Sequence, residues 1–138
     1  IFASEGSAEI VRLLLKARAD ANLVRKSGDS ALIYACDEGH AETAGILLEA
    51  GADKDWANGV GGTPLICACE KGHAAIVKLL LAAGANKDKA NHRGGTPLLR
   101  AAEQGDVETL CALLDARVDI NLTNKDGDSA LIFASEGS

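Results

Sequence analysis

The stretch "GGTPLICACEKGHAAIVKLLLAAGANKDKAN" at residues 61–91 decides the fold, because it has the features of one helix–turn–helix–loop unit. Thr63 is a good N-cap residue, and Pro64 follows at the first helical position, where a missing N–H costs nothing. A short, alanine-rich helix is predicted to end at Gly72, and a second helix to place the apolar residues of 76–81 mostly on one stripe. Gly84 is predicted to end the second helix in the left-handed conformation, before a polar loop.

The same unit recurs at intervals of 33 residues, and we call residues 33 apart a column. The cap triplet returns at 30–32, 63–65, 96–98 and 129–131, and the turn glycine returns as Gly6, Gly39, Gly72 and Gly105. Four copies of the apolar run begin at Ala8, Ala41, Ala74 and Val107. A fixed period of this length is the mark of a repeat protein. Such a chain is stabilised by stacking of neighbouring units, so no unit is expected to fold alone.

These motifs resemble the ankyrin repeat family, whose TPL, GH, IVKLLL and GA(D/N) signature residues 61–91 match almost throughout. The resemblance covers the whole chain as a single domain, residues 1–138. It divides the chain into a partial repeat at 1–26, repeats at 27–58, 59–91 and 92–124, and a partial repeat at 125–138. It implies an all-α solenoid of stacked helix–turn–helix units with projecting β-hairpin-like loops.

The chain departs from the family pattern at three points. The family usually has His after TPL, and apolar residues stand there instead, which adds packing: Ile33, Ile66, Leu99 and Ile132. Arg18 and Arg117 occupy the column of Gly51 and Gly84, where a left-handed non-glycine residue costs about 1 kcal/mol, so these two helix ends should be looser. The first and fifth units are also one residue short, so we expect a tightened end to the first helix of each.

Composition excludes several classes of function. At 138 residues the chain is one ordinary domain, and its net charge of −6 argues against a nucleic-acid partner. No apolar run approaches a membrane span. The four cysteines do not form a secreted disulfide framework, which favours a reducing, cytoplasmic compartment. The sequence contains no Met, so we expect it to be part of a longer product.

The cysteines raise the question of a metal site. Cys67 and Cys69, with His73 four residues on, form a candidate three-ligand cluster, but paired zinc ligands usually have two or more residues between them. Cys36 and Cys69 share a column that is normally packed between helices, where Cys acts as a small hydrophobe. Cys111 falls on an exposed face. We therefore expect neither a metal nor a cofactor.

No catalytic constellation emerges. His40 and His73 stand at the turn between the two helices, where we expect them to fix the turn by hydrogen bonding rather than to act as a base. The loop from Asp53 begins like a calcium-binding loop, but it has Asn58 at the sixth position and Pro64 at the twelfth, where Gly and Glu are needed. The chain is therefore not expected to be an enzyme.

The family resemblance implies a binding surface instead, because ankyrin repeats vary at their loop tips and at the exposed end of the first helix. Carried over, the loop positions are Lys26, Ser27, Asp29, Val60, His92, Arg93, Lys125, Asp126 and Asp128. The helix positions are Asp37, Glu38, Glu70, Lys71, Glu103 and Gln104. The helix positions are mainly acidic, which favours a protein partner with a basic or mixed patch. Trp56, the only tryptophan, is either an interface anchor on its loop or a cover for the loop stem.

The leading hypothesis is a non-catalytic scaffold that binds a protein partner through the concave face. A second hypothesis is a head-to-tail array, because neither end has a polar capping repeat and the apolar residues there would be exposed: Ile1, Phe2, Leu131, Ile132 and Phe133. A third is a designed repeat protein, and a fourth is the targeting domain of a larger enzyme.

The heptapeptide "IFASEGS" stands at both 1–7 and 132–138, with the same one-residue deletion. Joining the second copy to the first gives a continuous, in-phase solenoid. We interpret the repeated heptapeptide as marking equivalent points four repeats apart. It indicates a duplicated four-repeat block, a designed concatenation, or overlap along a continuous array.

Overall fold

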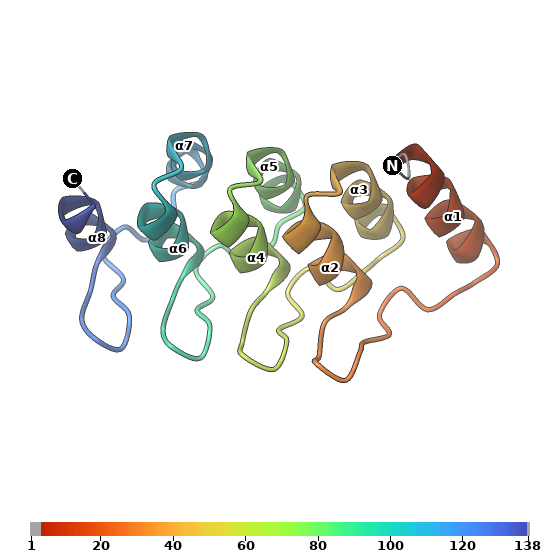
Figure 1. Ribbon diagram of the computed structural model, residues 1–138, viewed down its shortest axis with the longest axis horizontal. Coiled ribbons are helices and arrows are strands. Elements are labelled where there is room, and N and C mark those ends of the chain that lie inside the picture. The colour runs from red at the N-terminus through yellow and green to blue at the C-terminus, as the bar shows by residue number, and fades with distance from the viewer. Residues whose placement is uncertain (1–3, 138) are drawn as a thin grey trace.

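The computed structural model describes residues 4–137, which form helices connected by turns and long loops (Figure 1). The helices within this range are α1 (Ser4–Lys16), α2 (Ala31–Glu38), α3 (Ala41–Glu49), α4 (Pro64–Lys71), α5 (Ala74–Ala82), α6 (Pro97–Gln104), α7 (Val107–Asp115) and α8 (Ala130–Glu136). Over the same range the only β-bridge outside a strand is antiparallel, between Val24 and Ser30 in the first loop. None of the described helices is both long and apolar enough to cross a membrane.

The helices stack in two layers, and the loops project to one side (Figure 1). One layer holds the first helices of the units, in which α2 packs on α4, α4 on α6, and α6 on α8. The other holds the second helices, in which α1 packs on α3, α3 on α5, and α5 on α7. The predicted all-α solenoid of stacked helix pairs is confirmed.

The first helices begin at the predicted caps. The hydroxyl oxygens of Ser30, Thr63, Thr96 and Ser129 each accept a hydrogen bond from the N–H three residues later, at 3.2, 3.2, 3.2 and 3.3 Å. A cap of this kind stabilises a helix by about 1 kcal/mol. The first helices of the three internal units end at Gly39, Gly72 and Gly105, with φ of 79°, 70° and 75°. Helix ends at these glycines were predicted, and only glycine adopts this left-handed conformation without strain.

The second helices end at a column that holds glycine in two units and arginine in two. Gly51 and Gly84 have φ of 86° and 84°, and Arg18 and Arg117 have φ of 70° and 63°. In the glycine units the N–H after the left-handed residue donates to the carbonyl five residues back at 3.0 Å. After Arg117, the corresponding distance from the Val118 nitrogen to the Leu113 carbonyl oxygen is 3.5 Å. After Arg18, the distance from the Ala19 nitrogen to the Leu14 carbonyl oxygen is 2.9 Å. The predicted loosening is therefore seen at Arg117 and not at Arg18.

One apolar core runs along the stack between the two layers. Its repeated members are leucines of both helix layers and alanines of the first helices: Leu32, Leu65, Leu98, Leu47, Leu80, Leu113, Ala35, Ala68 and Ala101. The residues that replace the family histidine are buried as expected in the internal units, where Ile33, Ile66 and Leu99 are at most 2% exposed. Full burial of one such side chain contributes about 1.5–3 kcal/mol, so the stack is stabilised by contacts between units.

The two terminal units differ from the sequence prediction. In the first unit, α1 runs unbroken from Ser4 to Lys16 through Gly6, so the expected tightened helix end is wrong there. Ile1 and Phe2 lie outside the described residues. In the fifth unit, α8 has seven residues against eight in α2, α4 and α6, and Gly137 is right-handed with φ of −78°. With one residue fewer after the cap, Gly137 still lies in helical register and donates to the Phe133 carbonyl at 3.1 Å.

Candidate functional site

A groove runs along the stack between the projecting loops and the first helices, and we call it the loop–helix groove. Two depressions lie along it, and Asn91 lines both. The first is lined mainly by Asp29, Tyr34, Asp37, Val60, Cys67 and Glu70. The second is lined mainly by Arg93, Arg100, Glu103, Asp126, Asp128 and Phe133. Residues of neighbouring loops form one wall of each depression, and residues of two first helices form the other.

The loop wall is preorganised by side chains within the loops. In the three later loops, Asn58, Asn91 and Asn124 each accept two backbone N–H bonds through Oδ1, at 2.8–3.1 Å. Asx turns of this kind give the loop backbone hydrogen bonds that a helix or strand would otherwise provide. The first loop has Arg25 in this column, and its guanidinium lies 4.6 Å from the centre of the Tyr34 ring.

Neighbouring loops are also bonded to one another. The N–H groups of Gly59, His92 and Lys125 donate to the carbonyls of Ser27, Val60 and Arg93 at 3.2, 3.1 and 3.2 Å. Gly61 lies at the point of closest approach: its φ is 81°, and a Cβ there would stand 2.7 Å from the backbone nitrogen of His92. The loop wall is therefore one continuous hydrogen-bonded surface.

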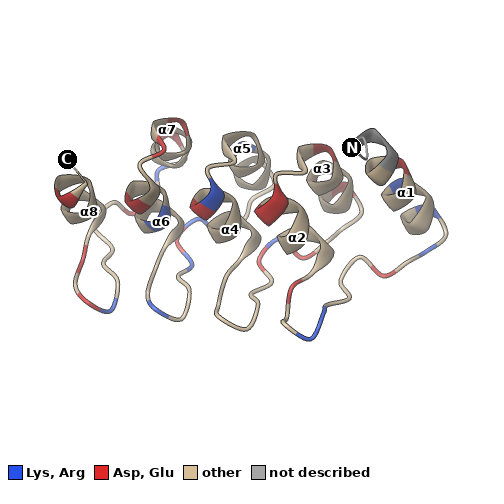
Figure 2. Ribbon diagram, in the orientation of Figure 1, with Lys and Arg blue, Asp and Glu red and all other residues tan. Residues whose placement is uncertain are grey.

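Charged side chains line the helix wall and bridge adjacent units. Arg100 of α6 pairs with Glu70 of α4 at 3.1 Å and also contacts Glu103 on its own helix. Lys71 of α4 pairs with Asp37 of α2 at 3.6 Å. Pairs that solvent still reaches contribute about 0–1 kcal/mol each. Figure 2 shows charged residues near the C-terminal ends of the first helices, while the tip of the loop before α4 carries none.

Apolar side chains contribute to both walls of the first depression. Val60 at the uncharged loop tip is 69% exposed, and Tyr34 across from it is 42% exposed. Cys67 is buried beneath them, at 7% exposure. Two large apolar side chains are thus presented to solvent on the two walls of one depression.

Three carboxylates line the same depression. Burial, and to a smaller extent the carboxylates of Glu70, Asp37 and Asp29, raise the pKa of the Cys67 thiol to about 12, against an opposing effect of Lys71. Two of these carboxylates are paired with cations, Glu70 with Arg100 and Asp37 with Lys71. The depression therefore offers both apolar contact and carboxylate oxygens to a bound segment.

All sixteen predicted site residues lie at the surface or are half-buried. The exposed ones are Lys26, Ser27, Glu38, Trp56, Val60, Lys71, His92, Arg93, Glu103, Gln104, Lys125 and Asp126. The half-buried ones are Asp29, Asp37, Glu70 and Asp128. The first depression brings together Asp29, Asp37, Val60 and Glu70, and the second brings together Arg93, Glu103, Asp126 and Asp128. The remaining eight lie outside the two linings.

Trp56 lies outside both depressions. Its indole Nε1 donates to the carbonyl of Gly28 at 2.7 Å, and its side chain joins its own loop to the preceding one. Of the two predicted roles, the hydrogen bond favours the structural one, as a link between loops rather than a cover for one stem. The ring is 39% exposed.

The sequence prediction missed one column of groove residues, namely Tyr34, Cys67, Arg100 and Phe133. These residues lie one turn before the predicted helix positions and face the loops. Their signal in the sequence is that four repeats carry four different side chains in this column, whereas the columns on either side are nearly constant.

The other candidate chemistry has a structural explanation. Cys36 and Cys69 are buried, as predicted, and burial raises the pKa of both thiols. Cys111 is exposed, also as predicted. Nε2 of His73 lies 3.1 Å from the carbonyl oxygen of Asp37 in the neighbouring unit, so this histidine links two repeats. Over residues 4–137, no group of three or more His, Cys, Asp or Glu side chains is placed to hold a metal ion.

The geometry defines a class of protein: a solenoid of stacked helix pairs with a groove between its loops and its first helices. A family model for ankyrin repeats in three copies matches residues 1–91 and 47–124. The chain therefore belongs to the ankyrin repeat family. No curated protein matches it. Ankyrin repeats are generally protein–protein interaction modules, and the family is typically non-enzymatic.

Proposed function

We propose that the chain is a non-catalytic scaffold that binds a protein partner through the loop–helix groove, on the concave face of the solenoid. One observation carries the proposal: two columns that hold a different side chain in each repeat contribute residues to the two walls of this groove. The loop column holds Ser27, Val60, Arg93 and Asp126, and the helix column holds Tyr34, Cys67, Arg100 and Phe133. The stacking columns, by contrast, hold four leucines and four alanines, at 32, 65, 98, 131 and at 35, 68, 101, 134.

The contrast has a physical meaning. Stacking requires the same shape in every unit, so residues that serve only the stack are expected to repeat. A partner with its own non-repeating sequence requires a different side chain at each step along the groove. Different side chains on both walls of the groove, beside constant stacking columns, therefore support recognition of a partner.

The charges favour one kind of partner. The first depression is lined by Val60 and Tyr34 together with the carboxylates of Asp29, Asp37 and Glu70. A complementary segment carries an apolar side chain with basic residues beside it, and complementary charge increases both specificity and the rate of encounter. The net charge of −6 also favours a partner segment with basic residues.

We also propose that the chain works in the cytoplasm. Cys36, Cys67 and Cys69 are buried as free thiols, and none of the four cysteines is in a disulfide. Buried free thiols in a protein that needs no disulfide are usual in a reducing compartment.

A pair of matched double variants tests the groove. The groove variant is Val60→Asp with Asp37→Lys. The control is Leu79→Asp with Glu49→Lys, on the second-helix layer, and it makes the same net change of charge on exposed or half-buried positions. Each protein is used to capture partners from cell extract, and bound proteins are quantified by mass spectrometry.

We expect partners bound by the parent chain to be retained by the control and lost from the groove variant. The proposal fails if the groove variant retains the parent's partners while the control loses them, or if the two lose them equally. Circular dichroism on both variants establishes that the helices are intact.

A further inference from the structure

The loop–helix groove already holds one arginine, which comes from the chain itself. Arg100 of α6 donates from Nε to Glu70 of α4 at 3.1 Å, and it also contacts Glu103 one turn further along its own helix. Its side chain reaches the loop wall as well, because a Cβ on Gly95 would stand 3.1 Å from the Arg100 Cδ. One guanidinium group therefore contacts two carboxylates on adjacent first helices, which is the geometry that arginine favours.

The same pair of carboxylates recurs one unit earlier, without the arginine. Moving back 33 residues from Arg100, the chain has Cys67, which has a much shorter side chain. The carboxylates in the equivalent positions are those of Asp37 on α2 and Glu70 on α4, and both line the first depression. Cys67 is buried at the bottom of this depression, at 7% exposure. The first depression therefore occupies the place that the Arg100 side chain fills in the next unit.

Both carboxylates keep an oxygen atom that can accept a further hydrogen bond. Glu70 accepts from Arg100 through Oε1, and no donor within residues 4–137 is bonded to its Oε2. Asp37 is paired with Lys71 through Oδ1 at 3.6 Å, which is longer than a hydrogen bond, and the Asp37 side chain is 37% exposed. An incoming guanidinium group can therefore donate to both carboxylates, and it displaces at most a weak surface pair.

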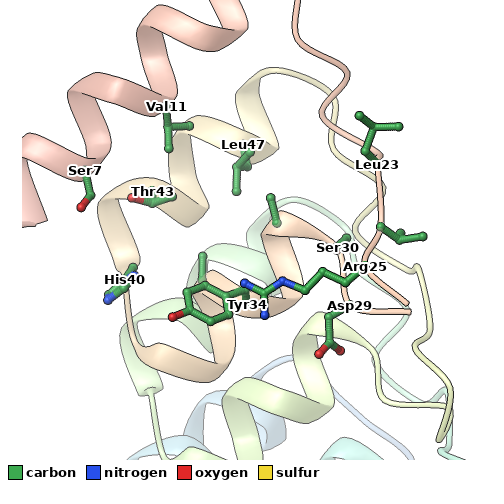
Figure 3. A pocket seen from close by; sticks show the side chains of 13 residues that line it. Ser7, Val11, Leu23, Arg25, Asp29, Ser30, Tyr34, His40, Thr43 and Leu47 are labelled. Atoms are coloured by element: carbon green, nitrogen blue, oxygen red, sulfur yellow. The ribbon is translucent and has the colours of Figure 1, made fainter. Parts of the chain in front are cut away.

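A second guanidinium group already lies beside this depression. Arg25, on the first loop, places its guanidinium 4.6 Å from the centre of the Tyr34 ring (Figure 3). Tyr34 also lines the first depression, together with Val60. Long basic side chains pack their aliphatic part on apolar surface and keep the charged end at polar groups. Tyr34 and Val60 can cover the aliphatic part of such a side chain while the carboxylates hold its charged end.

We propose that the first depression binds an arginine side chain of the partner, in the place that Arg100 has one unit further along the groove. The guanidinium group donates to Asp37 and Glu70, and the aliphatic part contacts Val60 and Tyr34. Arginine fits better than lysine, because its planar group donates to two carboxylates at once, whereas an ammonium group is a point charge. The inference rests on the proposed function, since it specifies which partner the groove recognises.

Blocked tripeptides test the arginine site without knowledge of the partner. The isotope-labelled chain is titrated with acetylated and amidated Gly-Arg-Gly, and separately with Gly-Lys-Gly, and the backbone amides are followed by NMR. We expect saturable shifts at Asp37, Cys67 and Glu70, and about 5–10-fold weaker binding of the lysine tripeptide. The proposal is overturned if the arginine tripeptide causes no saturable shift in the first depression, or if the two tripeptides bind equally.

Two matched variants test the role of the carboxylates. Asp37→Asn removes one charge from the lining, and Glu38→Gln removes the same charge from the next residue, which is exposed and lies outside the lining. We expect Asp37→Asn to weaken binding of the arginine tripeptide by about 5–10-fold and Glu38→Gln to leave it nearly unchanged. Equal effects of the two variants would mean attraction by net charge alone, which contradicts a site.

A third variant fills the depression from within the chain. Cys67→Arg gives Asp37 and Glu70 the arginine that Arg100 supplies in the next unit, and Leu79→Arg adds the same charge on the second-helix layer as a control. We expect Cys67→Arg to abolish binding of the arginine tripeptide and Leu79→Arg to retain it. Circular dichroism establishes that both variants are folded. Binding that survives Cys67→Arg in a folded chain overturns the proposal.

The same variants separate this inference from the proposed function. Partners that are lost from the groove variant, Val60→Asp with Asp37→Lys, but retained by Cys67→Arg would bind the groove without an arginine in the first depression. In that case the proposed function stands and the arginine site does not. If the arginine tripeptide binds as described and the chain captures no partner from extract, the arginine site stands and the proposed function does not.

Discussion

Replacing Arg117 by glycine is predicted to stabilise the chain. Arg117 ends α7 with φ of 63°, in the column where Gly51 and Gly84 end α3 and α5. The bond that closes this end, from the N–H of Val118 to the Leu113 carbonyl, is 3.5 Å long, whereas the bonds that follow the glycines are 3.0 Å. The arginine therefore carries a backbone strain that glycine would remove.

The magnitude follows from two opposing effects. A non-glycine residue in the left-handed region costs about 1–2 kcal/mol. Glycine gives back about 0.4–1 kcal/mol, because it has more conformational freedom in the unfolded chain. The backbone contribution expected for Arg117→Gly is therefore a gain of about 0.5–1 kcal/mol. The positive charge of Arg117 near a helix C-terminus is favourable by about 0.3–1 kcal/mol, so the charge has to be separated from the backbone effect.

Urea unfolding followed by circular dichroism measures the effect, with Arg117→Ala as the matched control. The alanine variant loses the same charge but keeps the left-handed strain, so the difference between the two variants isolates the backbone. We expect Arg117→Gly to be more stable than Arg117→Ala by about 0.5–1 kcal/mol. Gly84→Ala should be destabilising by a similar amount. If the glycine variant is no more stable than the alanine variant, the assignment of strain to this helix end is incorrect.

Three further predictions concern the thiols and a helix cap. A thiol reagent at pH 8 should modify only Cys111 in the native chain and all four cysteines in urea, as counted by mass spectrometry, because the other three are buried. Burial raises the pKa of Cys36, Cys67 and Cys69 above the ordinary 9.0, so the unfolded chain loses these protons first and stability falls as the pH rises above that value. The free energy of unfolding at pH 10 should be lower than at pH 8 by about 1.4 kcal/mol per buried thiol, and the urea midpoint should fall accordingly. A midpoint that is the same at both pH values would contradict the burial of these thiols. Thr63→Ala should lower the free energy of unfolding by about 1 kcal/mol, because it removes the hydrogen bond that the Thr63 hydroxyl accepts from the Ile66 N–H at 3.2 Å. Thr63→Ser keeps this hydroxyl and should retain most of the stability.

The interior of the fold was predictable because its determinants are local and recur. A Thr-Pro pair begins a helix and a glycine ends it through chemistry confined to one turn, so Thr63, Pro64 and Gly72 specify α4 without reference to the rest of the chain. The 33-residue period then places the same elements in the other units.

The terminal units were less predictable because their structure depends on neighbours. Gly6 has the sequence position of a turn, but residues 4–16 form one helix, so the turn signal alone does not decide the structure there. The spacing from the cap residue Ser129 to Gly137 is one residue shorter than in the internal units, and Gly137 therefore has a right-handed conformation. Patterns that work in a stacked unit are weaker guides where one neighbour is missing.

About half of the candidate site followed from the resemblance, and the rest depends on three-dimensional position. Val60 and Asp37 were placed on the binding face by family pattern, and both line the groove. Tyr34 and Arg100 were missed, because only the folded chain shows which side of a first helix faces the loops. The hydrogen bond from Trp56 to Gly28 joins residues 28 apart, and no local pattern indicates it.

The central claim is that this stack binds a protein along its loop–helix groove, and a photo-crosslinking comparison tests it most directly. A benzophenone side chain is placed at Val60, at the uncharged loop tip, and in a second protein at Leu79, on the second-helix layer. Both proteins are irradiated in cell extract, and adducts are resolved by mass. The account predicts a discrete protein adduct from position 60 and none from position 79. An adduct from position 79 with none from position 60 would contradict it.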